Sequence, residues 1–142
     1  EMEPPFLARA SVVPEAVSRL EVELAPDAHR FEIGNPNYLG LWVLGRSVEF
    51  LAEVGLEHIE ERVRQLTTYL MELLENRGKK VLTPYSWEER AGIVSVELPN
   101  SKKTVELLRE KKIIASARDG TLRFSPHFYN TEEELERSVN LL

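Results

Sequence analysis

Cysteine is absent from the 142-residue sequence, which excludes disulfides, thiolate metal sites and a cysteine nucleophile within these residues. The sequence also has no apolar run near the ~20 residues that a membrane-spanning helix needs. No signal-peptide pattern opens the chain. We therefore expect a cytoplasmic protein without a membrane partner.

Positive charge is also in short supply, because 18 Lys+Arg face 24 Asp+Glu and the formal net charge is −6. This acidic balance argues against nucleic acid as the main partner. The histidines His29, His58 and His127 are too scattered for a metal-ligand pattern, so no metal site is predicted. Glycine-rich nucleotide-binding motifs, phosphate-binding loops and nucleophile elbows are missing as well.

The middle of the chain carries a helical period. Apolar residues spaced three and four apart predict two long helices, over residues 38–54 and 56–77, packed on a core. In the first helix the expected buried stripe is Leu41, Leu44, Val48, Leu51 and Val54. Gly55 separates the two helices, and Gly78 stands where a left-handed C-terminal cap is needed.

After Gly78 the period of the apolar residues changes to two, which is typical of strands. The expected elements are strands over residues 80–83, 92–98, 113–118 and 121–125, a helix over residues 101–111, and a terminal helix begun by a capping box of Thr131 and Glu134. The order is two long helices followed by β-β-α-β-β-α. We expect an α+β fold in which helices cover one face of a small, mostly antiparallel sheet.

Residues 1–29 contain four prolines and little sustained period. One short helical stretch is expected over residues 14–24, with Pro14 in its first turn. We interpret residues 1–29 as a connecting segment from a domain that precedes them, and residues 30–142 as the folded domain.

The dipeptide Asp119-Gly120 suits a two-residue type I′ hairpin turn. With this turn, Arg118 lies opposite Thr121 and Ser116 lies opposite Arg123, and all four side chains share one face. The other face is then apolar: Ala115, Ala117, Leu122 and Phe124. An arginine held on a strand can bind a carboxylate or phosphate through two parallel hydrogen bonds. The alternative is a solvated sheet face with two exposed arginines.

Two loops could also carry function. Gly34-Asn35-Pro36-Asn37 precedes the first long helix, where backbone and amide donors suit an anion; the alternative is a helix-entry turn with Asn37 as N-cap. The aromatic turn around His127 and Tyr129 either contributes to a site or only docks the terminal helix.

Taken together, these motifs resemble the C-terminal portion of class V aminotransferases. These are pyridoxal-phosphate (PLP) enzymes of fold type I, and they include cysteine desulfurases, kynureninase and isopenicillin N epimerase-like enzymes. The resemblance is carried, in order, by Arg30-Phe31-Glu32-x-Gly-Asn-Pro-Asn, Gly55-Leu56-x-x-Ile59, Arg90-Ala91-Gly92-Ile93-Val94-Ser95 and Arg123-Phe124-Ser125-Pro126-His127-Phe128-Tyr129-Asn130-Thr131. It implies the small domain of a PLP-dependent, homodimeric enzyme acting on a small amino acid.

The resemblance also implies roles for single residues. Arg123 matches the arginine that grips the substrate α-carboxylate. Gly34 and Asn35 match the loop that reaches the cofactor phosphate of the partner subunit, although Asn35 stands where threonine is usual and an amide donor replaces a hydroxyl. Arg118 has no firm family role, and we keep it as a hypothesis for a second substrate contact.

The resemblance places the Schiff-base lysine and its partner aspartate in a large N-terminal domain, so we expect no catalytic residue in this chain and no turnover by it alone. Desulfuration needs a cysteine near residues 114–120, where none stands, so this reaction is disfavoured. Transamination, epimerisation, lyase chemistry and kynureninase-type cleavage stay open. The alternative function is a stand-alone α+β regulatory domain that senses a small carboxylate through Arg123 and Arg118.

Overall fold

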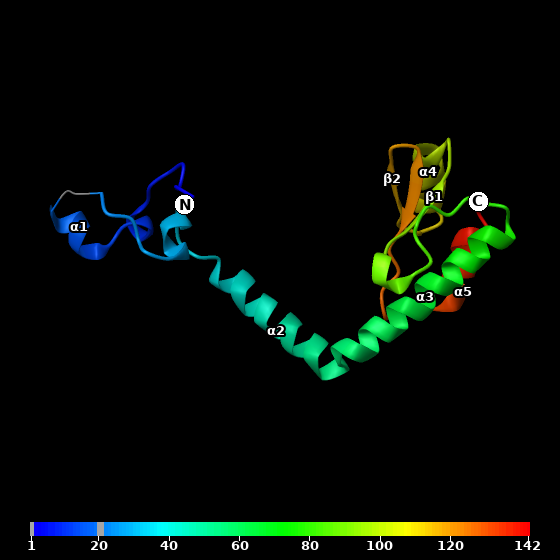
Figure 1. Cartoon of the computed structure of the whole chain (residues 1–142), viewed down its shortest axis with the longest axis horizontal. Helices are drawn as coiled ribbons and strands as arrows, with labels where there is room; N and C mark the ends of the chain where they lie inside the picture. The colour runs from blue at the N-terminus through cyan, green and yellow to red at the C-terminus, as the bar shows by residue number, and fades with distance from the viewer. Residues whose placement is uncertain (1, 20–21) are drawn as a thin grey trace. The chain divides into compact units, whose positions relative to one another are not determined.

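The computed structural model describes residues 2–19 and 22–142, and the chain divides into two compact units, Glu1–Phe50 and Leu51–Leu142 (Figure 1). The first unit contains the short 3-10 helices η1 (Arg9–Ser11) and η2 (Ala28–Phe31), the helix α1 (Pro14–Arg19) and most of α2 (Tyr38–Val54). The second unit contains the remaining helices and the sheet. The second unit corresponds to the α+β arrangement of helices and sheet that the sequence predicts.

A buried serine ties the first unit together. The Ser11 hydroxyl is fully buried and donates to the Glu32 carbonyl at 3.0 Å. Val12 and Leu24 form an antiparallel bridge next to it. The helix expected over residues 14–24 is therefore too long: α1 ends at Arg19, residues 20 and 21 lie outside the described residues, and Leu24 is held in the bridge instead of a helix.

Helix α2 has the predicted bounds, Tyr38–Val54, and the Asn37 side chain caps it by accepting from the Gly40 N–H at 2.9 Å. The predicted packing of this helix is wrong, because α2 has no buried residue. Leu41, Leu44 and Val48 of the expected stripe are all more than half exposed. The periodic pattern identified the helix correctly but not its surroundings.

Helix α3 (Leu56–Asn76) follows Gly55, whose φ of +91° suits a glycine. It ends as predicted at Gly78, which has a φ of +68° and donates to the Glu75 carbonyl at 2.7 Å. Lys79 donates to the Leu74 carbonyl at 3.0 Å, which completes a Schellman motif. The side chains of α3 that are buried are Val63, Leu66, Thr67, Leu70, Met71 and Leu74.

Three antiparallel strands form the sheet in the order β1-β3-β2: β1 (Val94–Glu97), β2 (Ser116–Arg118) and β3 (Thr121–Phe124). The fourth expected strand, over residues 80–83, is reduced to a single bridge between Val81 and Val96. Around this bridge the Leu82 N–H donates to the Ser95 carbonyl at 2.8 Å and the Glu97 N–H donates to the Lys80 carbonyl at 2.9 Å. The Ser95 N–H donates to the Thr83 side-chain hydroxyl at 2.8 Å and not to a backbone carbonyl.

The hairpin between β2 and β3 is the predicted one. Asp119 and Gly120 both have positive φ, +50° and +75°, as a type I′ turn requires. The register pairs Ser116 with Arg123 and Arg118 with Thr121. Both expectations about this hairpin are confirmed.

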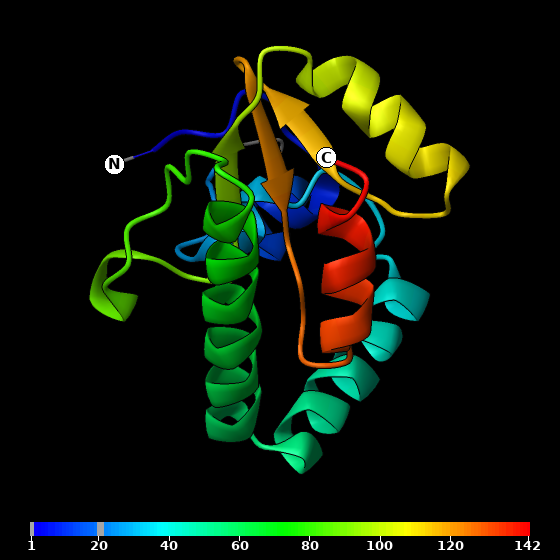
Figure 2. The ribbon, with the colours of Figure 1, turned by 90° about the vertical axis from the view of Figure 1, so that its right-hand side faces the viewer.

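The α-helices α3, α4 and α5 of the second unit share one core with the sheet, whereas the 3-10 helix η3 (Trp87–Glu89) has no buried residue. Helix α3 contacts β1 and lies beside α5 (Glu132–Val139), and α4 (Ser101–Glu110) contacts β2 and β3 (Figures 1 and 2). The buried core consists of Leu66, Leu70, Met71 and Leu74 of α3, Val94 and Val96 of β1, Leu108 of α4, Leu122 and Phe124 of β3, and Leu135 and Val139 of α5. Because the buried strand residues lie on one face of the sheet, the α+β prediction of a sheet covered by helices is confirmed.

Helix α5 begins with the predicted capping box of Thr131 and Glu134 and is tied to α3 by an ion pair. The Arg62 guanidinium donates to both carboxylate oxygens of Glu132, at 2.6 and 3.1 Å. This hydrogen bonding lowers the pKa of Glu132 from 4.5 to about 2.

The low pKa of Glu132 predicts a pH dependence of stability. Because the folded pKa is below the unfolded value of 4.5, the ion pair stabilises the fold above about pH 4.5, and this contribution is lost as the pH falls towards 2. In urea unfolding measured over this range, Glu132→Gln is expected to flatten the pH profile, whereas Glu133→Gln keeps it. A wild-type profile in Glu132→Gln contradicts the prediction.

Candidate functional site

The face of the sheet opposite the helices is polar. It carries two cross-strand rows, Ser95–Arg123–Ser116 and Glu97–Thr121–Arg118. Leu122 and Phe124 anchor β3 from the other side, where they are 0% and 5% exposed. Because side chains alternate along a strand, the burial of these two residues fixes Arg123 on the polar face, as predicted.

Arg123 is the central residue of this polar face. It is half-buried, and its Nε atom is buried without a hydrogen-bond partner. Within residues 2–19 and 22–142, no ion pair involves Arg123, whereas Arg62 pairs with Glu132. A buried donor without an acceptor is costly, and an anionic ligand would remove that cost.

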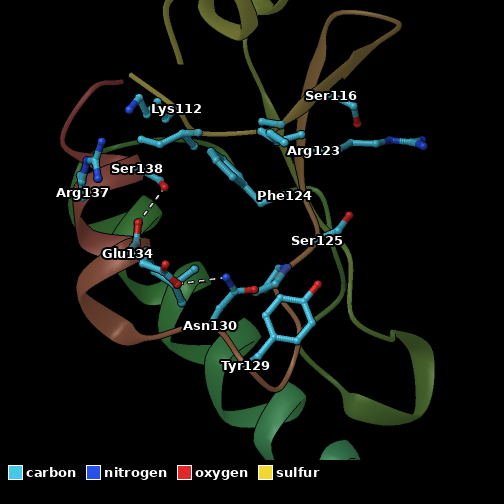
Figure 3. Close-up of a pocket in the computed structure, with 15 residues that line it drawn as sticks. Lys112, Ser116, Arg123, Phe124, Ser125, Tyr129, Asn130, Glu134, Arg137 and Ser138 are labelled. Atoms are coloured by element: carbon cyan, nitrogen blue, oxygen red, sulfur yellow. Dashed lines mark hydrogen bonds between the residues drawn. The ribbon is translucent and has the colours of Figure 1, made fainter. Parts of the chain in front are cut away.

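Arg123 lines one edge of a cavity of about 520 Å³, together with Ser116, Ser125, Tyr129 and Asn130. In Figure 3 the side chains of Ser116 and Arg123 extend in the same direction, away from α5, whose Glu134, Arg137 and Ser138 border the opposite side. The arginine and the serine hydroxyl therefore lie together at the open side of the sheet.

Arg118 lies on the same polar face, in the neighbouring row, but it does not line this cavity. Its side chain is 69% exposed, and its Nε lies 3.5 Å from Oδ2 of Asp119, which is 90% exposed. An exposed ion pair of this kind contributes little to stability. The guanidinium of Arg118 can therefore bind a ligand at a small cost in free energy, because only this exposed ion pair has to be broken.

The lysines of the second unit lie outside any enclosed site. Lys79 donates to the carbonyl of Leu142 at 2.8 Å, and Lys80 pairs with Glu97 at 2.6 Å. Lys112 lines the 520 Å³ cavity, but in Figure 3 it points away from Arg123 at the end near α5. The other lysines, Lys102, Lys103 and Lys111, are exposed.

The loop predicted to bind phosphate belongs to the first unit. Gly34 and Asn35 line a cavity of about 360 Å³ together with Ala8, Arg9 and Ala10. Asn37 does not line this cavity and caps α2 instead, which confirms the helix-entry interpretation for that residue.

Sequence reasoning did not identify Arg9 as a neighbour of this loop. The two segments meet because Ser11 binds the Glu32 carbonyl, and no local pattern in the sequence signals that long-range hydrogen bond. An exposed guanidinium beside the Asn35 amide and the Gly34 backbone is a combination of donors that suits an anion.

The turn around His127 docks α5, as one interpretation predicted. The His127 backbone N–H donates to the Asn130 side chain at 2.8 Å, and Asn130 in turn donates to Glu134 of α5 at 3.0 Å. The imidazole stacks on Tyr129, with ring centroids 5.2 Å apart. Its Nδ1 is buried without a partner, and no pattern in the sequence predicts this.

The part of the chain that the structure describes has no helix long and apolar enough to cross a membrane. Within the same residues, no three His, Cys, Asp or Glu side chains come together in a way that could hold a metal ion.

Comparisons with known proteins identify relatives of this chain. The family model for class V aminotransferases matches residues 2–137. The chain is 31% identical to isopenicillin N epimerase from Streptomyces clavuligerus, over 100% of this chain and 39% of that protein.

Two solved structures share the fold. The apo cysteine desulfurase of Thermococcus onnurineus NA1 is similar with a TM-score of 0.81 and 24% identity, over 98% of this chain and 38% of that chain. A mutant of C-DES with glycine covalently linked to the PLP cofactor has a TM-score of 0.82 and 21% identity, over 99% of this chain and 37% of that chain.

The chain spans less than two fifths of the length of these relatives. Over that span the matches cover nearly all of this chain, and the fold is an α+β arrangement like that of the corresponding part of the solved desulfurase. The chain belongs to the class V aminotransferase family.

Proposed function

We propose that this chain supplies the substrate-carboxylate side of the active site of a PLP-dependent enzyme acting on a small amino acid. The observation that carries the proposal is Arg123, a half-buried guanidinium on an open sheet face with a buried, unpartnered Nε. A carboxylate accepts two parallel hydrogen bonds from a guanidinium, so the α-carboxylate of an amino acid suits this residue.

The cofactor PLP is proposed because the chain belongs to the class V aminotransferase family. PLP supplies an electron sink to its substrates when it is bound. The donors of the first unit fit its phosphate group, because Gly34, Asn35 and Arg9 line one cavity. We propose that Gly34 and Asn35 contact the cofactor phosphate of a partner subunit in a homodimer, and that Arg9 adds positive charge beside them.

Helix α2 supports the proposal that further protein encloses this chain. Its exposed apolar residues include Leu39, Leu41, Trp42, Val43, Leu44 and Phe50, each between 49% and 72% exposed. A helix that is apolar on all sides is normally buried in a larger protein. We propose that a cofactor domain outside this chain covers α2 and supplies the lysine for PLP.

The residues near Arg123 make one type of reaction, desulfuration, unfavourable. The stretch from Ser116 to Gly120 is a tight hairpin without a cysteine, so it offers no sulfur acceptor for desulfuration. We propose transaminase, lyase or epimerase chemistry for the complete enzyme, in which Arg123 orients the substrate through its carboxylate.

One experiment tests whether the lysine that binds PLP lies outside this chain. Both proteins are incubated with PLP and reduced with borohydride. The isolated 142-residue chain is expected to form no stoichiometric PLP adduct on any one lysine, whereas the full-length gene product is expected to gain one PLP per subunit. Mass spectrometry of both proteins provides the measurement. A stoichiometric adduct on one lysine of the isolated chain would overturn the prediction.

A further inference from the structure

We propose that the amino-acid substrate carries a second anionic group on its side chain, and that Arg118 binds this group while Arg123 binds the α-carboxylate. The inference rests on the proposed function and narrows it to a substrate class: acidic amino acids, whose side chain ends in a carboxylate or a similar anion.

The geometry of the hairpin carries the inference. Ser116 lies opposite Arg123, and Arg118 lies opposite Thr121, so the four side chains form a square on the polar face. The two arginines occupy one diagonal, and the two hydroxyl residues occupy the other. Diagonal neighbours on a sheet are roughly 7–8 Å apart, which is within reach of long side chains. One small molecule can therefore contact both guanidinium groups.

The charges on this face are unbalanced. No ion pair neutralises Arg123 within the described residues, and the only ion pair of Arg118 is the exposed contact with Asp119 at 3.5 Å. Glu97 does not compensate for them, because it pairs with Lys80 at 2.6 Å. Two guanidinium groups of like charge therefore share one surface of a chain whose net charge is −6. A ligand with two anionic groups neutralises both, whereas a ligand with one leaves Arg118 with only its exposed contact to Asp119.

The Thr121 hydroxyl and the turn fix the backbone that carries these four side chains. The Thr121 hydroxyl donates to the Arg118 carbonyl at 2.6 Å, across the mouth of the hairpin. The type I′ turn fixes the backbone between them, with Asp119 and Gly120 both at positive φ. Ser116 extends beside Arg123 in Figure 3, so its hydroxyl can donate to the same carboxylate that Arg123 binds. Arg118 is then left for the side chain of the substrate.

The test uses the full-length gene product with bound PLP and two pairs of nearly isosteric substrates: L-aspartate with L-asparagine, and L-glutamate with L-glutamine. At least one acid is expected to show a kcat/KM about tenfold or more above that of its amide, because a hydrogen-bonded charge is lost in the amide. Arg118→Gln is expected to bring this ratio close to one. The matched control Arg109→Gln removes an exposed charge on α4, on the other side of the sheet, and keeps the ratio.

A binding measurement accompanies the kinetics. Isothermal titration of the same holoenzyme with succinate and with butyrate compares a diacid with a monoacid of the same chain length. The diacid is expected to bind more tightly, and Arg118→Gln is expected to abolish the difference. Equal kcat/KM values within both substrate pairs, or a preference for the acid that survives in Arg118→Gln, would overturn the inference. Turnover of neutral amino acids alone would leave the proposed function standing, whereas a protein that neither binds PLP nor reacts with any amino acid would sink both.

Discussion

Arg123→Ala in the full-length gene product is expected to weaken the binding of the amino-acid substrate by about 10- to 150-fold. This range corresponds to about 1.5–3 kcal/mol for the loss of hydrogen bonds to a charged carboxylate. The affinity for PLP should change little, because Arg123 contacts the substrate and not the cofactor in the proposed site. Both affinities can be measured by titration of the absorption spectrum of the bound cofactor.

Two further variants make this prediction sharper. Arg123→Lys keeps the charge but loses the planar fork that binds both carboxylate oxygens, so an intermediate loss is expected. Arg109→Ala removes an exposed arginine of α4 and serves as the control that leaves substrate affinity unchanged. Wild-type affinity in Arg123→Ala would exclude the assigned role of Arg123.

Leu122→Ala is expected to lower the free energy of unfolding of the chain by about 2–5 kcal/mol, the range for truncating a buried leucine. Leu122 is 0% exposed and lies in β3, directly before Arg123. Its side chain packs in the core shared by the helices and the sheet, and the surrounding residues cannot close the resulting cavity completely. Urea denaturation of wild type and variant under the same conditions measures the difference.

The chain offers a matched control for Leu122→Ala. Ile114 precedes β2 and is 92% exposed, so Ile114→Ala removes apolar atoms from solvent instead of the core. Its effect is expected to stay within about 0.5 kcal/mol. If both variants lose the same stability, then the helices do not anchor β3, and the orientation of Arg123 needs another cause.

Local features of the fold could be predicted from the sequence because their causes are local. The type I′ turn at Asp119 and Gly120, the end of α3 at Gly78 and the capping box of Thr131 each depend on residues within a few positions of one another. Strand alternation then placed Arg123 and Ser116 on one face without any knowledge of the rest of the molecule.

The resemblance to class V aminotransferases was likewise available from the sequence, and the family model confirms it. The assignment of Arg118, Arg123, Gly34 and Asn35 to binding, and the boundary expected at residues 29 and 30, stay predictions. These depend on protein surfaces and ligands that local patterns in one chain do not specify.

By itself, the sequence determined where α2, α3, α5 and the β2–β3 hairpin lie, because propensity, capping and alternation act over a few residues. The tertiary structure decided what surrounds them. It left α2 without buried residues, reduced the strand expected over residues 80–83 to one bridge, and brought Arg9 to Gly34 through Ser11. It also left Nε of Arg123 buried without a partner, because burial and hydrogen bonding depend on neighbours far away in the chain.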